Sequence, residues 1–69
     1  MQGTHFEIHQ LNDAGEPVAL RGSYTVHPGQ PVEVAQSLAR DVAHDIAADE
    51  GVDLGIFERT FKRVATVVP

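Results

Sequence analysis

Three side chains near the N-terminus have the types and the spacing of metal ligands. His5, Glu7 and His9 form a His-x-Glu-x-His motif, and alternate residues of a β-strand project from the same face. Imidazole and carboxylate groups are ordinary zinc ligands, although same-face neighbours lie about 6.5–7 Å apart along a strand, a wide spacing around one ion. The competing interpretation is a cross-strand ion pair between Glu7 and Arg21. We therefore predict no cofactor and keep the motif as an alternative metal site.

A second set of polar side chains recurs in steps of four along a predicted helix. This acidic stripe consists of Glu33, Asp41, Asp45 and Asp49, and is interrupted by Ser37. Like charges four residues apart oppose helix formation by only about 0.2–0.5 kcal/mol per pair, so a solvated helix face explains the pattern without a function. Its functional interpretation is a surface for a basic partner, because complementary charge speeds encounter and selects the partner. That partner is either the Arg59, Lys62 and Arg63 surface of a second copy or a groove of another protein that normally holds nucleic acid.

The net charge of −5 is unevenly distributed along the chain. Residues 1–55 carry nine acidic and two basic side chains, whereas residues 56–69 carry three basic side chains and one acidic one. Overall acidity repels phosphate backbones at long range, which disfavours a dedicated nucleic-acid binder. The basic residues Arg59, Lys62 and Arg63 keep a nucleic-acid-associated homodimer as an alternative.

Several signatures of other protein classes are missing from the chain. No Gly-x-Ser-x-Gly motif occurs, and no glycine-rich loop leads into the predicted helix to hold a phosphate, so we predict a non-enzymatic protein. The lack of cysteine excludes disulfides and thiolate metal sites. No apolar run approaches the ~20 residues of a membrane span. We expect a cytoplasmic protein without membrane contact.

A β-hairpin over residues 4–27 is the first element expected to position these groups. Asp13, Ala14 and Gly15 predict a three-residue loop in which Gly15 is left-handed. If Asn12 pairs with Glu16, the apolar side chains of both strands share one face. The expected opposite pairs are then Phe6–Gly22, Ile8–Leu20, Gln10–Val18, His5–Ser23, Glu7–Arg21 and His9–Ala19.

An amphipathic helix is predicted over residues 31–50. Pro31 suits the first helical position, and Gly51 suits a left-handed C-cap. Large apolar residues recur every four positions at Val34, Leu38, Val42 and Ile46, with alanines beside them at Ala35, Ala39, Ala43 and Ala47. We expect the large residues to face the sheet and the alanines to let the helix lie close to it.

The last segment fits two structures. Large apolar residues recur at helical spacing from Leu54 to Val64, but residues 60–68 are rich in strand-forming types. Because a hairpin and one helix are rarely stable without a third strand, we predict a strand over about residues 58–68. The predicted fold is a single α+β domain, residues 1–69, with two layers in the order ββαβ. Its antiparallel sheet is covered on one face by the helix.

The expected core of this domain combines both elements. It comprises Phe6, Ile8, Leu20, Tyr24, Val26, Val34, Leu38, Val42, Ile46 and Phe61. A chain of 69 residues buries only about 60% of the surface that its unfolded form exposes. Without disulfides, association is the economical source of further stability, and an unpaired strand edge attracts a second copy. We therefore expect a homodimer.

In size, acidity and lack of catalytic groups, the chain resembles a class of small inhibitors carried by phages and mobile elements, such as anti-CRISPR proteins, and some antitoxins. The resemblance covers no motif. Together with the acidic stripe, it favours a protein-binding module that inhibits a basic, nucleic-acid-handling partner through Glu33, Asp41, Asp45 and Asp49. The alternatives are a nucleic-acid-associated homodimer that uses Arg59, Lys62 and Arg63, and a metal- or ligand-binding protein that uses His5 and His9.

Overall fold

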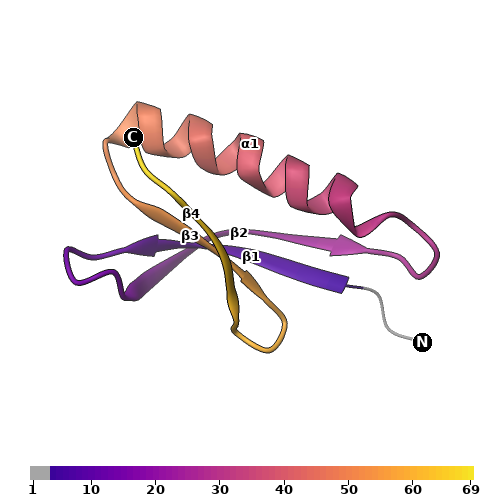
Figure 1. Ribbon diagram of the computed structural model, residues 1–69. Coiled ribbons are helices and arrows are strands. Elements are labelled where there is room, and N and C mark those ends of the chain that lie inside the picture. The colour runs from indigo at the N-terminus through magenta and orange to yellow at the C-terminus, as the bar shows by residue number, and fades with distance from the viewer. Residues whose placement is uncertain (1–3) are drawn as a thin grey trace.

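A four-stranded antiparallel sheet carries one helix on one of its faces (Figure 1). The computed structural model describes residues 4–69. The elements are β1 (Thr4–Leu11), β2 (Pro17–Val26), α1 (Val32–Glu50), β3 (Leu54–Glu58) and β4 (Arg63–Val67), and the strand order is β2-β1-β3-β4. The predicted α+β class, with two layers and an antiparallel sheet under one helix, is confirmed.

The C-terminal segment is a second hairpin, so the prediction of one strand over residues 58–68 was wrong. Two backbone hydrogen bonds close the turn between β3 and β4, from Glu58 N–H to the Lys62 carbonyl at 2.9 Å and from Phe61 N–H to the Glu58 carbonyl at 2.8 Å. β3 lies against β1, with Ile56 opposite Ile8. Its residues are apolar almost throughout because both faces of this central strand are covered.

The first hairpin has the predicted turn but not the predicted register. Gly15 is left-handed at φ 79°, and Asn12 N–H donates to the Glu16 carbonyl at 2.9 Å. Register shifts beside Ile8 and Gln10 then place extra residues on β2, as β-bulges do. The expected pairs are therefore wrong, and the observed pairs are Phe6–Tyr24, Ile8–Gly22, Gln10–Ala19, His5–Thr25, Glu7–Ser23 and His9–Leu20.

The bulged register separates Arg21 from Glu7, so their predicted ion pair does not form. Arg21 instead donates to Gln10 at 2.8 Å and to both carboxylate oxygens of Glu50. The hydrogen bonds from Arg21 to Glu50 lower the pKa of the Glu50 carboxyl below its usual value. The contact ties β2 to the C-terminal turn of α1, which ends as predicted at a left-handed Gly51.

The helix turns its alanines toward the sheet rather than its large apolar residues. This alanine column, comprising Ala35, Ala39, Ala43 and Ala47, is at most 7% exposed. Val34 and Leu38 are 57% and 52% exposed, which contradicts their predicted place in the core. The two stripes lie about 100° apart around the helix, so only one can face the sheet. The small side chains face the sheet because they let the helix backbone approach it closely.

The core consequently draws most of its large side chains from the strands. Of the expected members, Phe6, Ile8 and Val26 are buried, and Tyr24, Val42 and Ile46 are partly buried. Leu20 and Phe61 are exposed, like Val34 and Leu38, so all four predictions were wrong. The buried residues that the prediction omitted include Leu54, Ile56 and Val67 on the helix side of the sheet.

Substitutions at neighbouring helix positions test which stripe faces the sheet. Ala39→Leu forces a larger side chain into a fully buried site and is expected to lower the free energy of unfolding by about 1–3 kcal/mol. Leu38→Ala shortens a half-exposed side chain and should change it by about 0.5 kcal/mol or less. Urea unfolding followed by circular dichroism measures both. A larger loss from Leu38→Ala would contradict this helix orientation.

Candidate functional site

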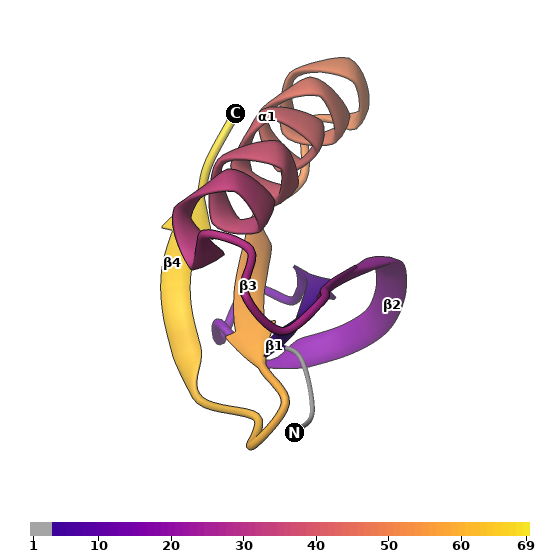
Figure 2. The same cartoon turned by 90° about the vertical axis from the view of Figure 1, so that its right-hand side faces the viewer.

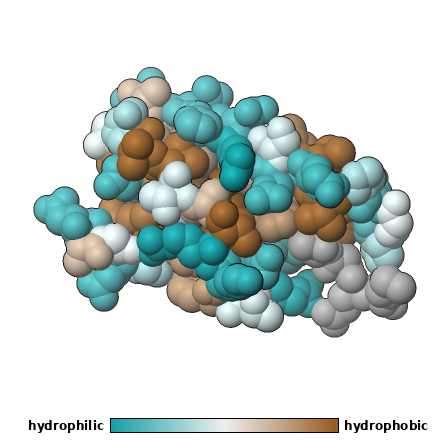
Figure 3. All heavy atoms as spheres, viewed as in Figure 1, coloured by the Kyte–Doolittle hydropathy of each residue, from teal (hydrophilic) through white to brown (hydrophobic). Residues whose placement is uncertain are grey.

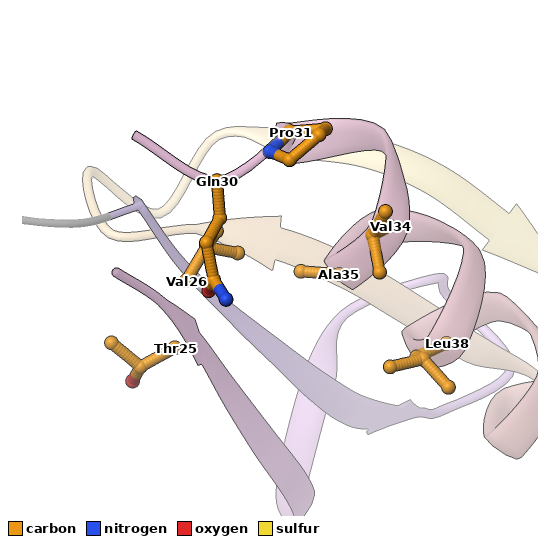
Figure 4. A pocket seen from close by; sticks show the side chains of 7 residues that line it. All are labelled: Thr25, Val26, Gln30, Pro31, Val34, Ala35 and Leu38. Atoms are coloured by element: carbon orange, nitrogen blue, oxygen red, sulfur yellow. The ribbon is translucent and has the colours of Figure 1, made fainter. Parts of the chain in front are cut away.

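An apolar groove lies between α1 and β2. At its N-terminal end the helix lies over β3 and β4, so that β2 stands away from it (Figure 2). The resulting hollow has a volume of about 290 Å³. This α1–β2 groove is lined by Thr25, Val26, Gln30, Pro31, Val34, Ala35 and Leu38. Val34 and Leu38 extend into it from the helix (Figure 4), which explains how residues of a core-like type remain exposed.

The acidic stripe runs along the solvent side of α1, beginning beside the groove at Glu33 and continuing along the helix beyond Leu38, the last groove residue of α1. Glu33, Asp41, Asp45 and Asp49 are all exposed, as expected for a solvated or partner-binding face. Three of them directly precede a large apolar residue of the helix, which places the stripe about 100° further around from the groove side. Hydrophilic side chains dominate the outer side of α1 (Figure 3). Within residues 4–69, none of the four carboxylates forms an ion pair.

The His-x-Glu-x-His motif projects from the face of the sheet opposite to the helix, and both of its histidines bind Glu7. The Glu7 carboxylate accepts hydrogen bonds from Nε2 of His5 at 3.2 Å and from Nε2 of His9 at 3.0 Å. The bond from His9, and then that from His5, lowers the pKa of the Glu7 carboxyl. A metal ion would compete for the same lone pairs, and in the described part of the chain no cluster of such side chains is arranged to hold one.

An aromatic cluster adjoins this motif and covers the centre of the helix-free face. It comprises His9, Phe57, Phe61 and Arg63. The Phe57 and Phe61 rings stack with centroids 4.6 Å apart, and the His9 ring meets both edge-on at 5.3 Å. The Arg63 guanidinium lies 5.3 Å from the Phe57 centroid, a cation–π arrangement. Phe57 is 3% exposed, so this face buries a large side chain without a helix.

The basic residues gather beside the aromatic cluster, at the β3–β4 turn. Arg59 and Lys62 lie in the turn and Arg63 begins β4, and all three are exposed. Arg63 also donates a hydrogen bond to the Gly15 carbonyl, which joins the two hairpins. Sequence reasoning named the three basic residues but missed their association with stacked rings. The two-residue spacing of Phe57, Arg59, Phe61 and Arg63 was not a usable signal, because residues 59–62 form a turn that makes Phe57 and Arg63 partners on neighbouring strands.

The comparisons with known proteins supply no further information about these surfaces. No protein-family model matches the chain, and the searches of curated proteins and of solved structures find no match. Within residues 4–69, no helix has the length and apolar character needed to cross a membrane. The α1–β2 groove, the acidic stripe and the aromatic cluster are the surfaces that could bind a partner.

Glycine substitutions on β3 and β2 test how the aromatic cluster is packed. A methyl group at Gly55 would lie 2.8 Å from Cε2 of Phe57 and 3.2 Å from Cδ2 of Leu11. Gly55→Ala should therefore lower the free energy of unfolding by about 1–3 kcal/mol and shift the ring proton resonances of Phe57 and Phe61. In the matched control Gly22→Ala, the nearest atoms lie at 3.8 Å. Equal effects of both substitutions would contradict this packing.

Proposed function

We propose that the protein is a non-enzymatic binding module that inhibits a basic partner protein by binding an amphipathic segment of it in the α1–β2 groove. The observation that carries this proposal is the exposure of Val34 and Leu38, 57% and 52%, near an acidic stripe that forms no ion pair within residues 4–69. Apolar side chains at the centre with charged groups at the rim are typical of protein–protein interfaces.

Charge complementarity defines the chemistry of the segment that is bound. Apolar side chains at helical spacing would enter the groove beside Val34 and Leu38, in the manner of a helix bound in a groove. Lysine and arginine on the flank of the same segment would face Asp41 and Asp45. Because the carboxylates are exposed to solvent, they steer encounter and choose the partner more than they add affinity.

The partner is inhibited because the segment that binds in the groove is one that it needs for its own function. A basic segment that holds phosphate groups in the free partner is blocked once it faces the acidic stripe, and no catalysis is required. The proposed partner therefore handles nucleic acid. The biological setting that this proposal favours is an anti-defence protein of a phage or mobile element, such as an anti-CRISPR protein, which acts in the cytoplasm.

Binding of a designed peptide tests the groove and the stripe separately. The probe is a fluorescein-labelled amphipathic helix of leucine and lysine, measured by fluorescence anisotropy. Leu38→Ser removes an apolar contact, and the double substitution Asp41→Lys with Asp45→Lys reverses two charges. Each variant is expected to raise the Kd about tenfold or more, equivalent to about 1.4 kcal/mol.

Two controls separate groove binding from general attraction between opposite charges. Asp13→Lys makes a charge reversal in the exposed β1–β2 turn and should leave the Kd within about twofold, because long-range effects between exposed charges are screened. A scrambled peptide of equal charge should bind weakly. Equal binding of the scrambled peptide, or an unchanged Kd for Leu38→Ser or for the charge-reversed double variant, would contradict the proposal.

We also propose that two copies pair through the β2 edge. The sheet has two edge strands, β2 and β4. The β4 edge is only five residues long, and the charged residue Lys62 directly precedes it. Short length and charge both protect an edge strand from pairing. β2 is ten residues long and exposes Val18 and Leu20. Its two bulges lie before residue 22, and residues 22–26 keep a regular register. An antiparallel contact between two β2 strands is self-complementary, as a two-fold dimer requires.

Light scattering tests this pairing directly. The wild-type chain is expected to have the mass of a dimer at micromolar concentration, and Leu20→Lys should shift it to the monomer because an edge lysine opposes strand pairing. Val68→Lys places the same charge at an exposed position outside the strands and should leave the dimer intact. A monomeric wild-type protein, or a dimeric Leu20→Lys variant, would refute the pairing.

A further inference from the structure

We propose a second binding site, for single-stranded nucleic acid, formed by the aromatic cluster and the basic residues of the β3–β4 turn. This site is on the helix-free face of the sheet and uses no residue of the α1–β2 groove. Bases would stack on the Phe61 ring, and phosphates would lie against Arg59 and Lys62.

The first argument is the placement of Phe61. Its ring is stacked on Phe57 and held edge-on by His9, yet the residue is 52% exposed. Phe61 also has a φ of 64°, which places a bulky residue in the left-handed region. The chain therefore holds an aromatic side chain at the surface in an unfavourable backbone conformation. A ring fixed by a second ring loses little freedom when a base stacks on it.

The second argument is the local charge around this ring. Arg59, Lys62 and Arg63 are exposed within five consecutive positions. Two acidic residues are near these cations. Glu58 precedes Arg59 in the chain, and the Glu7 carboxylate already accepts hydrogen bonds from two imidazoles. The acidic stripe is on the helix, on the other side of the sheet. Cationic side chains around a stacking ring are the recurring design of single-strand binding surfaces.

The exposed ring of Phe61 favours nucleic acid over an acidic protein as the ligand of this surface. An acidic peptide would use the cations alone, whereas the exposed ring matches the flat face of a base. A single strand fits better than a duplex, whose bases are already stacked on each other and inaccessible to a protruding ring. Because phosphate contacts displace counterions, the affinity should fall steeply with added salt.

The test uses a fluorescein-labelled oligouridine of ten nucleotides and fluorescence anisotropy at low salt. Phe61→Ala is expected to raise the Kd at least about fivefold, while Phe61→Tyr, which keeps a ring, should stay within about twofold. Lys62→Ala should reduce the slope of log Kd against log salt by about 0.7, the value for one phosphate contact on a single strand. Circular dichroism confirms that each variant is folded.

Comparison probes identify the ligand class and separate this site from the groove. Oligoglutamate of equal charge and a duplex of equal length should bind more weakly than the oligouridine. Leu38→Ser should leave oligouridine binding unchanged, and Phe61→Ala should leave binding of the amphipathic peptide unchanged. Absence of oligouridine binding at low salt, an unchanged Kd for Phe61→Ala, or equal binding of oligoglutamate would overturn the proposal.

Discussion

The close approach of α1 to the sheet is the constraint on which the rest of the structure depends. Four alanines with at most 7% exposure form the centre of the helix surface that contacts the sheet. Because they supply little apolar volume, the sheet provides the large buried side chains, among them Phe6, Ile8, Leu54 and Ile56. Val34 and Leu38 line the groove beside β2, whereas Val42 and Ile46 pack partly against the core. The α1–β2 groove and the exposure of the acidic stripe therefore both follow from the orientation of the helix.

The single helix leaves the other face of the sheet uncovered. On that face the Phe61 ring of the β3–β4 turn stacks on Phe57, and Gly55 leaves room for the Phe57 ring. Arg63 joins this turn to the β1–β2 turn through the Gly15 carbonyl. The basic residues are thereby kept on the side away from the acidic helix. This separation of charge gives the small domain two surfaces with different chemistry.

Local signals predicted the fold well, and tertiary packing explains the errors. Turn and capping chemistry predicted the left-handed glycines at positions 15 and 51. The same chemistry predicted a helix over residues 31–50, and the observed helix is Val32–Glu50. The rotation of the helix about its axis could not be predicted in this way, because the large apolar residues and the alanines both repeat every four residues. The bulges of β2 lie next to Gly22 and Pro17, residue types that often mark bulges, but these residues do not by themselves fix the register. The turn of residues 59–62 contains no glycine, proline or asparagine, so a continuous strand was the natural prediction. The exposure of the acidic stripe was predictable, but the groove beside it depends on the helix rotation.

Thiol labelling at adjacent helix positions tests the central claim most directly, because the chain has no cysteine of its own. Leu38→Cys should react with Ellman's reagent nearly as fast as an unfolded peptide, since position 38 opens into the groove. Ala39→Cys should be protected by about a hundredfold or more, because its thiol becomes accessible only when the structure opens. Protection at position 38 together with fast reaction at position 39 would mean that the helix is rotated by about 100°, and would contradict both the packing and the groove.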